Sequence, residues 1–324
     1  MKVHVPYESR QTIGGGYTFY RNFIDCMADE DDVQFVSEDE DFDILFAFSP
    51  TTVSGESIER AKGKGAKFIL RMDGVPEDNR NSGKGTRRLI EYASKADFII
   101  YQSNFVQNTV GRIIANNGVQ SPHRVIRNGV NTHIFTPDGG KENFTGKPNI
   151  LHIAYRKDNN KRYEEVLAMY REYFMSNKQA NLVLLGRYPT EWNEFGMGFF
   201  NGERFNAIGI TTDEEYKARM IRSCDFFFYP SFADPCPNVV MEVMACGVPV
   251  LYQPYGGVRE MVQPTPELGG GIWNDYTESF TDNINLLLKE REFYSKRAIE
   301  IAQNHTLEIM ALDYISAFET ALES

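Results

Sequence analysis

Short apolar runs alternate with amphipathic stretches along most of the chain, which is the pattern of an α/β protein. Residues 43–48, 98–101, 149–154 and 226–229 are almost entirely apolar. Such runs are expected of parallel strands that are covered on both faces. Further strands are predicted at residues 3–5, 67–71, 182–185, 207–209 and 248–251, and helices at residues 58–64, 87–94, 161–174, 213–222, 284–290, 293–303 and 306–322.

Two further helices are predicted from local signals. The first follows the glycine loop at residues 14–16 and carries Tyr20, Phe23 and Met27 at helical spacing. The second begins after Ser103, a residue type that caps helix N-termini, and continues through Val110. Both helices extend the alternation of strands and helices.

The alternation runs through two series, separated by the polar, glycine-rich residues 138–148. This composition is typical of a linker. A chain of 324 residues is also long for a single core. We therefore predict a first domain at residues 1–139 and a second at residues 140–304, followed by a final helix at residues 305–324.

Composition and charge exclude some function classes. The hydrophobic fraction of 42% supports sizeable cores, and the net charge of −11 repels nucleic acid. A few basic residues stand out between positions 62 and 88. A solvated surface is the commoner explanation for them, but peripheral contact with an anionic membrane or an anionic acceptor stays open.

The cysteines and the termini indicate a cytoplasmic protein. Cys26, Cys224, Cys236 and Cys246 lack metal-site or disulfide-framework spacing, so we interpret them as reduced thiols. The first residues are too short and polar for a signal peptide, and no apolar run approaches the ~20 residues that span a bilayer.

The segment from residue 227 to residue 260 carries the strongest chemical pattern. It predicts a buried strand, a loop with Asp234, a helix whose first turn contains Pro237, and a second strand. The free N–H groups of residues 238–240 (Asn238, Val239 and Val240) are expected to bind phosphate. Glu242 lies eight positions after Asp234. Two acids around an anion-binding helix start suit a nucleotide-linked sugar.

This segment resembles the E-x7-E signature of retaining glycosyltransferases of the GT-B fold, family 4 in particular. Three blocks match in order and spacing: Pro230-Ser231, residues 242–250 and residues 256–260. The chain departs from the signature in two ways, because Asp234 replaces the first glutamate and residues 235–237 read Pro-Cys-Pro where the family has Gly-Phe-Gly. Residues 127–137 resemble the family hinge.

The resemblance implies two Rossmann-like domains that face a cleft, with the last helix crossing back to the N-terminal domain. The N-terminal domain would serve the acceptor and the C-terminal domain the donor. It also implies transfer with retention, no required metal or other cofactor, and a nucleoside-diphosphate sugar, UDP- or GDP-linked, as donor. The acceptor hydroxyl would belong to a glycan, a lipid or a protein.

Arg156 and Lys161 follow the first strand of the second domain and lie five positions apart, the family's R-x4-K spacing. Two fixed cations at a strand's carboxyl edge can neutralise a diphosphate leaving group. A solvated charge cluster is the plainer explanation. With the other motifs in place, we favour the catalytic role.

The two acids also have structural alternatives. Glu242 lies on an otherwise apolar helix, where an unpaired charge is costly, so we expect it to accept hydrogen bonds from the donor ribose. Asp234 is expected to hold hydroxyls of the transferred sugar. Its simpler role is that of an acid stabilised near a helix N-terminus.

Other candidates are weaker. Gly15 and Gly16 are expected to let the backbone approach the donor phosphate or the acceptor. The alternative is that they form an ordinary surface turn. Backbone near Gly186 and Ile208 is expected to contact the donor base. Asp73 stands where many family members carry a histidine, and a catalytic role is about as plausible as an ion pair with Arg71. His152, within an apolar strand, is expected to be a core residue.

Two alternatives stay open. Another GT-B enzyme, such as a sugar-nucleotide epimerase or a sugar-phosphate phosphorylase, fits the same motifs. A catalytically silent sugar-nucleotide-binding protein fits the Asp-Pro-Cys-Pro departure at residues 234–237. A plain dehydrogenase is disfavoured, because no dinucleotide-binding fingerprint follows the first strand.

Overall fold

The computed structural model describes residues 1–324 except for residues 7–13, 75–82, 156–160, 189–203 and 275–278. The described residues form two compact units. The first unit contains the described parts of residues 1–11 and 16–129 together with residues 307–324. The second contains the described parts of residues 12–15 and 130–306. The change of unit therefore lies between Gly129 and Val130, and the last helix belongs to the first unit.

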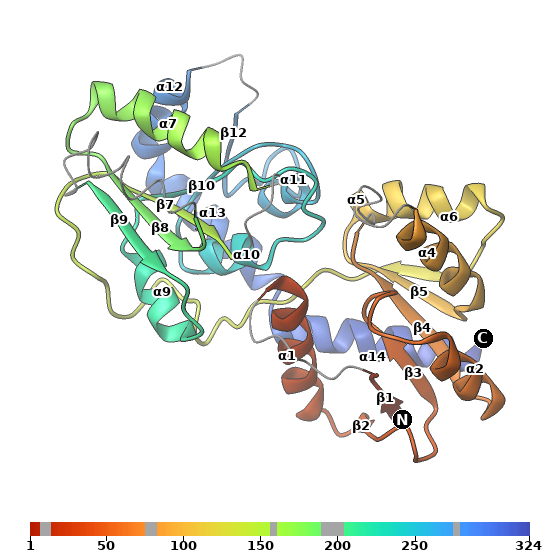
Figure 1. Cartoon of the computed structure of the whole chain (residues 1–324). Coiled ribbons are helices and arrows are strands. Elements are labelled where there is room, and N and C mark those ends of the chain that lie inside the picture. The colour runs from red at the N-terminus through yellow and green to blue at the C-terminus, as the bar shows by residue number, and fades with distance from the viewer. Residues whose placement is uncertain (7–13, 75–82, 156–160, 189–203, 275–278) are drawn as a thin grey trace. The chain divides into compact units, whose positions relative to one another are not determined.

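The first unit is built on a parallel sheet of six strands in the order β2-β1-β3-β4-β5-β6 (Figure 1). Its strands are β1 (Lys2–His4), β2 (Gln34–Phe35), β3 (Ile44–Ala47), β4 (Lys67–Met72), β5 (Phe98–Tyr101) and β6 (His123–Val125). Its helices are α1 (Gly15–Ala28), α2 (Gly55–Gly63), α4 (Lys84–Lys95), α5 (Asn104–Val106), the π-helical turn η1 (Gln107–Gly111), α6 (Arg112–Asn116) and α14 (Leu307–Glu323).

Alternate residues of the central strands enter two different cores. Ile44 and Phe46 of β3 face a core shared with α1 and α14, whereas Leu45 faces a core shared with α2, α4 and η1. The side-chain period of two makes this division automatic in a strand that is apolar at every position. Phe318 of α14 packs against Phe46 with ring centroids 5.4 Å apart. The predicted return of the last helix to the first domain is confirmed.

The second unit is a parallel sheet of six strands in the order β12-β11-β10-β7-β8-β9. Its strands are β7 (Asn149–Ala154), β8 (Asn181–Gly186), β9 (Phe205–Gly209), β10 (Phe226–Tyr229), β11 (Val250–Tyr252) and β12 (Gly271–Trp273). Its helices are α7 (Tyr163–Ser176), α9 (Glu214–Arg222), α10 (Asn238–Ala245), α11 (Val258–Val262), α12 (Phe280–Lys289) and α13 (Arg291–Gln303).

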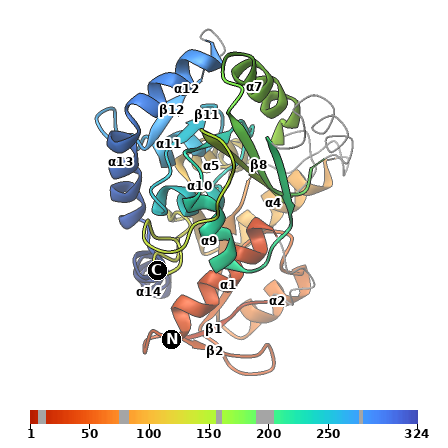
Figure 2. The same cartoon turned by 90° about the vertical axis from the view of Figure 1, so that its left-hand side faces the viewer.

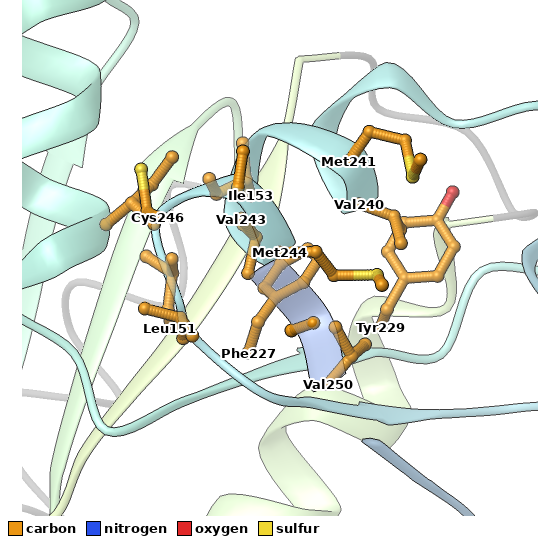
Figure 3. Packing of buried hydrophobic residues seen from close by; sticks show 14 of the residues in the cluster. Leu151, Ile153, Phe227, Tyr229, Val240, Met241, Val243, Met244, Cys246 and Val250 are labelled. Atoms are coloured by element: carbon orange, nitrogen blue, oxygen red, sulfur yellow. The ribbon is translucent and has the colours of Figure 1, made fainter. Parts of the chain in front are cut away.

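Helices cover both faces of this sheet. Helices α7 and α12 pack together on one face over Phe226 and Phe228 (Figure 2). Helices α9, α10, α11 and α13 cover the other face, where Phe227 and Tyr229 lie. Figure 3 shows Tyr229 beside Val240 of α10, with its hydroxyl pointing away from Val250. Helix α10 is apolar around most of its surface because it packs against both the sheet and the neighbouring helices.

The strand order creates a switch point between β7 and β10. From β7 the chain adds β8 and β9 on one side, then returns to add β10, β11 and β12 on the other. In open parallel sheets the crevice outside the carboxyl ends at such a point is where ligands bind. The segments that follow β7 and β10 are therefore the first place to look for a site.

Most predicted elements exist, with shifted ends. Ser103 caps α5 by accepting from the Val106 N–H, as predicted. The strands β2, β6 and β12 escaped prediction because each has only two or three residues and none of them is buried. Gly15 and Gly16 were expected in a loop but form the first turn of α1, where backbone N–H groups have no helical partner in any sequence. No helix in the described part of the chain has the length and hydropathy to cross a membrane.

Candidate active site

Two loops at the switch point bring Lys161 and Asp234 into contact. The Lys161 ammonium donates to Asp234 Oδ2 at 2.8 Å, and both side chains are 20% exposed. The hydroxyl of Tyr229, the last residue of β10, donates to the same oxygen at 2.8 Å. The sequence separates Lys161 from Asp234 by more than seventy positions, yet the parallel register of β7 and β10 places their following segments side by side.

The electrostatics keep Asp234 ionised. Burial raises the pKa of its carboxyl, but Lys161, the Tyr229 hydroxyl and the Cys236 N–H outweigh burial, so the pKa lies below its ordinary value. Burial of the Tyr229 hydroxyl and the nearby charge of Asp234 hold the pKa of Tyr229 well above its ordinary value. Tyr229 therefore stays a hydrogen-bond donor, and the ion pair is charged at neutral pH.

The backbone of Asp234 is clamped from the next strand's loop. Its carbonyl accepts from the Gly257 N–H at 2.9 Å, and it forms a parallel bridge with Gly256. Gly256 has φ of 107°, and a Cβ there would lie 2.6 Å from the Asp234 carbonyl oxygen. Only glycine fits this approach. The Gly256-Gly257 pair is therefore needed to fix the loop that carries Asp234.

Glu242 is buried inside α10 and is paired with a lysine from another helix. Its carboxylate is 5% exposed and forms an ion pair with Lys217 of α9, itself 11% exposed. The Lys217 ammonium also lies 5.4 Å from the ring centre of Tyr155 and 5.5 Å from that of Phe135. Burial lowers the pKa of Lys217, but the charge of Glu242 reverses this, and the pKa lies above its ordinary value.

Lys217 is a residue that the sequence reasoning missed. Its helix was predicted at residues 213–222, but the lysine itself had no predicted role. Its spacing to Met220 and Ile221, both buried, was the available signal, because positions three and four apart share one helix face. A lysine on a buried face requires a partner, and the acid on apolar α10 supplies it.

The N-terminus of α10 differs from the prediction in one donor. Pro237 occupies the N-cap position, and Asn238 and Val239 begin the helix. The N–H of Val240 was expected to be free, which is wrong: it donates to the Pro237 carbonyl at 3.0 Å. A short-range bond of this kind tightens the first turn and removes one N–H from ligand binding.

Gly186 and Ile208 lie on the β8–β9 side of the same sheet. Gly186 ends β8 opposite Ala154, with φ of 117°, and a Cβ there would lie 2.2 Å from the Ala154 carbonyl oxygen. Ile208 is half-buried at an irregularity in β9, between the residues that pair with Leu184 and Leu185. Gly186 therefore stands at the carboxyl edge of the sheet, and its contact with the donor base stays a prediction.

In the first unit, Asp73 follows β4 with an exposed side chain, and its carbonyl accepts from Gln102 Nε2 at 2.6 Å. The guanidinium of the buried Arg71 bonds Gln102 Oε1 at 2.5 Å, Asn128 Oδ1 at 2.6 Å and the Phe48 carbonyl. It also lies over the Phe19 ring at 3.8 Å. Arg71 thus ties β4 to the ends of neighbouring strands.

The remaining candidates are quickly placed. Arg156 lies outside the described residues. His152 is buried in β7, as predicted for a core residue: Nδ1 lies 3.1 Å from the Phe228 carbonyl oxygen, and burial lowers the pKa to about 4. Cys224 and Cys246 are buried free thiols. A Cβ at Gly15 or Gly16 would meet no described atom within 4 Å.

Comparison with known proteins adds the family. The sequence model of glycosyl transferases group 1 matches residues 136–305, more than half of the chain. The chain belongs to this family. An α-1,3-N-acetylgalactosaminyltransferase of Campylobacter jejuni that acts on N,N'-diacetylbacillosaminyl-diphospho-undecaprenol is 23% identical over 187 residues, covering 56% of this chain and 47% of that protein. The chain spans about half the length of the curated relatives it matches.

Solved structures match over nearly the whole chain. The sucrose-phosphate synthase of Thermosynechococcus elongatus has a TM-score of 0.75 at 16% identity and covers 99% of both chains. HepE of Anabaena, solved with UDP and glucose, has a TM-score of 0.77 at 13% identity and covers 99% of this chain and 100% of that one. These likenesses establish the GT-B fold that the sequence predicted. The chain is a glycosyltransferase-family protein of two Rossmann-like, parallel-sheet domains.

Proposed function

We propose that this protein is a retaining glycosyltransferase that transfers a sugar from a UDP- or GDP-linked donor to a hydroxyl of a glycan, lipid or protein, in the cytosol. The observation that carries the proposal is the half-buried Lys161–Asp234 pair at the switch point of the second sheet, beside the start of α10. Family membership and UDP complexes of a structural neighbour support it.

The pair has a clear chemical use. A lysine ammonium 20% exposed at a sheet's carboxyl edge can bind a diphosphate, and the N-terminus of α10 adds partial positive charge. When the diphosphate takes Lys161, the Asp234 carboxylate loses one donor and can accept a hydroxyl of the donor sugar. Glu242, fixed by Lys217, would accept from the ribose.

The reaction then needs no protein nucleophile. The acceptor oxygen forms a bond to the anomeric carbon on the face that the diphosphate leaves, so configuration is retained. The bond from that carbon to the diphosphate oxygen breaks, and the acceptor proton moves to the departing oxygen. Lys161, with Arg156 from the sequence pattern, stabilises the charge that develops on the diphosphate. In this proposal a divalent metal is not required.

A matched pair of variants tests the site. Lys147 and Asp225 join the same two strands at their opposite, amino edge, with the ammonium 3.2 Å from the carboxylate. We expect Lys161→Ala to abolish the thermal stabilisation given by UDP-glucose, UDP-N-acetylglucosamine or GDP-mannose, whereas Lys147→Ala keeps it. Equal stabilisation in both variants would remove Lys161 from the site.

Product analysis separates the remaining functions. Nuclear magnetic resonance of the glycoside formed from the stabilising donor and a mixture of acceptors should show the donor's anomeric configuration, with or without EDTA. Conversion of the sugar nucleotide without an acceptor would indicate an epimerase. Binding without any turnover would indicate a silent binding protein. An inverted glycoside would refute the front-face mechanism.

A further inference from the structure

Two exposed aromatic rings stand next to Asp234 in the second unit. Phe232 and Tyr255 are each 42% exposed, and their ring centroids are 5.6 Å apart. Phe232 precedes Asp234 by two positions on the loop after β10, and Tyr255 directly precedes Gly256, which bridges to Asp234. The rings therefore extend from the same clamped pair of loops as the proposed sugar-binding carboxylate. Neither the fold nor the proposed reaction has yet given them a role.

The backbone holds Phe232 outward at an energetic cost. Arg162 and Ala233, with φ of 50° and 55°, are the non-glycine residues of the described chain that have left-handed backbone. Such conformations are strained and gather at functional sites. Ala233 directly follows Phe232, and the Arg162 guanidinium lies 5.4 Å over the Phe232 ring. Both strained residues thus act on the position of one ring.

The same strain connects the rings to the ion pair. Arg162 directly follows Lys161, so the turn that sets the guanidinium over Phe232 also sets the ammonium on Asp234. A loop built only to pack would turn Phe232 into the core, since burial of an aromatic side chain is favourable. The chain instead keeps two rings in water beside a carboxylate and a cation.

From this arrangement we infer that Phe232 and Tyr255 form a carbohydrate subsite that stacks on the apolar C–H face of a pyranose ring. An aromatic face carries partial negative charge and attracts the positively polarised C–H groups of such a ring. The adjacent Asp234 can accept from a hydroxyl at the ring's edge. The subsite rests on the proposed function for the identity of its sugar, which belongs either to the donor or to the acceptor.

A matched control exists in the same unit. Phe293 of α13 is 51% exposed, lies 5.4 Å from the ring of Tyr294, and has the Arg297 guanidinium 5.5 Å over it. It sits at the opposite edge of the sheet, because the neighbouring Arg291 Nε donates to the carbonyl of Asp225, directly before β10. Phe293→Ala therefore removes an equivalent exposed ring far from Asp234.

The test compares wild type, the Phe232→Ala/Tyr255→Ala double variant and Phe293→Ala. Calorimetric titration with UDP, UDP-glucose, GDP and GDP-mannose gives the affinity that the sugar adds to each nucleotide. Saturation-transfer nuclear magnetic resonance with methyl glucoside and methyl N-acetylglucosaminide observes sugar binding without a nucleotide. Thermal midpoints of the variants verify that they are folded.

A donor-side subsite predicts that the double variant loses about tenfold in the affinity added by the sugar while nucleotide affinity is unchanged. An acceptor-side subsite predicts unchanged titrations but loss of saturation transfer to the glycosides. Phe293→Ala should match wild type in both. If both readouts of the double variant equal wild type, the subsite is refuted while the proposed function stands. If wild type binds no nucleotide, the proposed function fails, and the glycoside experiment still decides the subsite.

Discussion

The buried Lys217–Glu242 pair gives a prediction whose size follows from the structure. Lys217→Met keeps the length and apolar stem of the side chain but removes the charge. The Glu242 carboxylate, 5% exposed, is then left without its counter-ion. Breaking a buried ion pair in this way costs about 3–5 kcal/mol, because one charge remains buried and uncompensated. We expect the free energy of unfolding of the second unit to fall by this amount.

The assay is urea unfolding followed by tryptophan fluorescence. Both tryptophans, Trp192 and Trp273, belong to the second unit's part of the chain, so the signal reports on that unit. With a denaturant dependence of about 3 kcal/mol/M for a unit of this size, the midpoint should fall by about 1–2 M. The exposed Lys178, 4.6 Å over the Phe174 ring in the same unit, provides the control Lys178→Met, which should leave the midpoint unchanged.

A double variant separates stability from binding. Lys217→Met/Glu242→Leu removes both charges and should recover stability to within about 1 kcal/mol of wild type, since apolar replacement of a buried pair is often neutral. It should nevertheless lose nucleotide binding, because the ribose acceptor is gone. A midpoint shift below about 0.3 M for Lys217→Met alone would refute the reasoning. So would full nucleotide affinity in the double variant.

Three further predictions concern the same sheet. Tyr229→Phe removes a hydrogen-bond donor to Asp234, so the Asp234 pKa should rise and the acidic limit of sugar-nucleotide binding should move to higher pH. Tyr252→Phe, in register on the next strand, should leave that limit unchanged, and equal pH profiles of binding in the two variants would contradict the role of Tyr229. Folded His152 takes a proton only near pH 4, whereas the unfolded chain takes it near 6.5. The free energy of unfolding should therefore fall by up to about 3 kcal/mol as the pH is lowered from 6.5 to 4. His152→Leu should reduce this pH dependence, whereas the control His133→Leu should not. Gly256→Ala should cost about 1–3 kcal/mol more than Gly209→Ala, because both have left-handed φ but only at Gly256 would the new Cβ overlap Asp234; similar unfolding midpoints would refute the clamp.

The alternation of apolar runs was sufficient to predict both sheets. Residues such as Phe226 and Phe227 are apolar on successive positions, which is typical of a short strand buried on both faces. The short strands β2, β6 and β12 lacked that signal. Helix ends shifted because capping residues, such as Asp213 before α9, decide them more sharply than periodicity does.

A site residue was predictable where its neighbours in the sequence made it unusual. Glu242 stood out on an apolar helix, and Asp234 by its spacing. Tyr229 did not, because its hydroxyl finds Asp234 only after the loop folds back on β10. Phe232 and Tyr255 gave no signal, since exposure of an aromatic residue beside a strand depends on the left-handed turn at Ala233. Partners set by tertiary geometry leave little trace in the local pattern.

The central claim is that the carboxyl edge of the second sheet binds the diphosphate of a sugar nucleotide. A crystal structure of the chain with the nucleotide that stabilises it most tests this directly. We expect the diphosphate on the Lys161 ammonium and the N-terminus of α10, with the ribose hydroxyls on Glu242. A nucleotide bound elsewhere, with the Lys161–Asp234 contact intact and Glu242 unliganded, would contradict it.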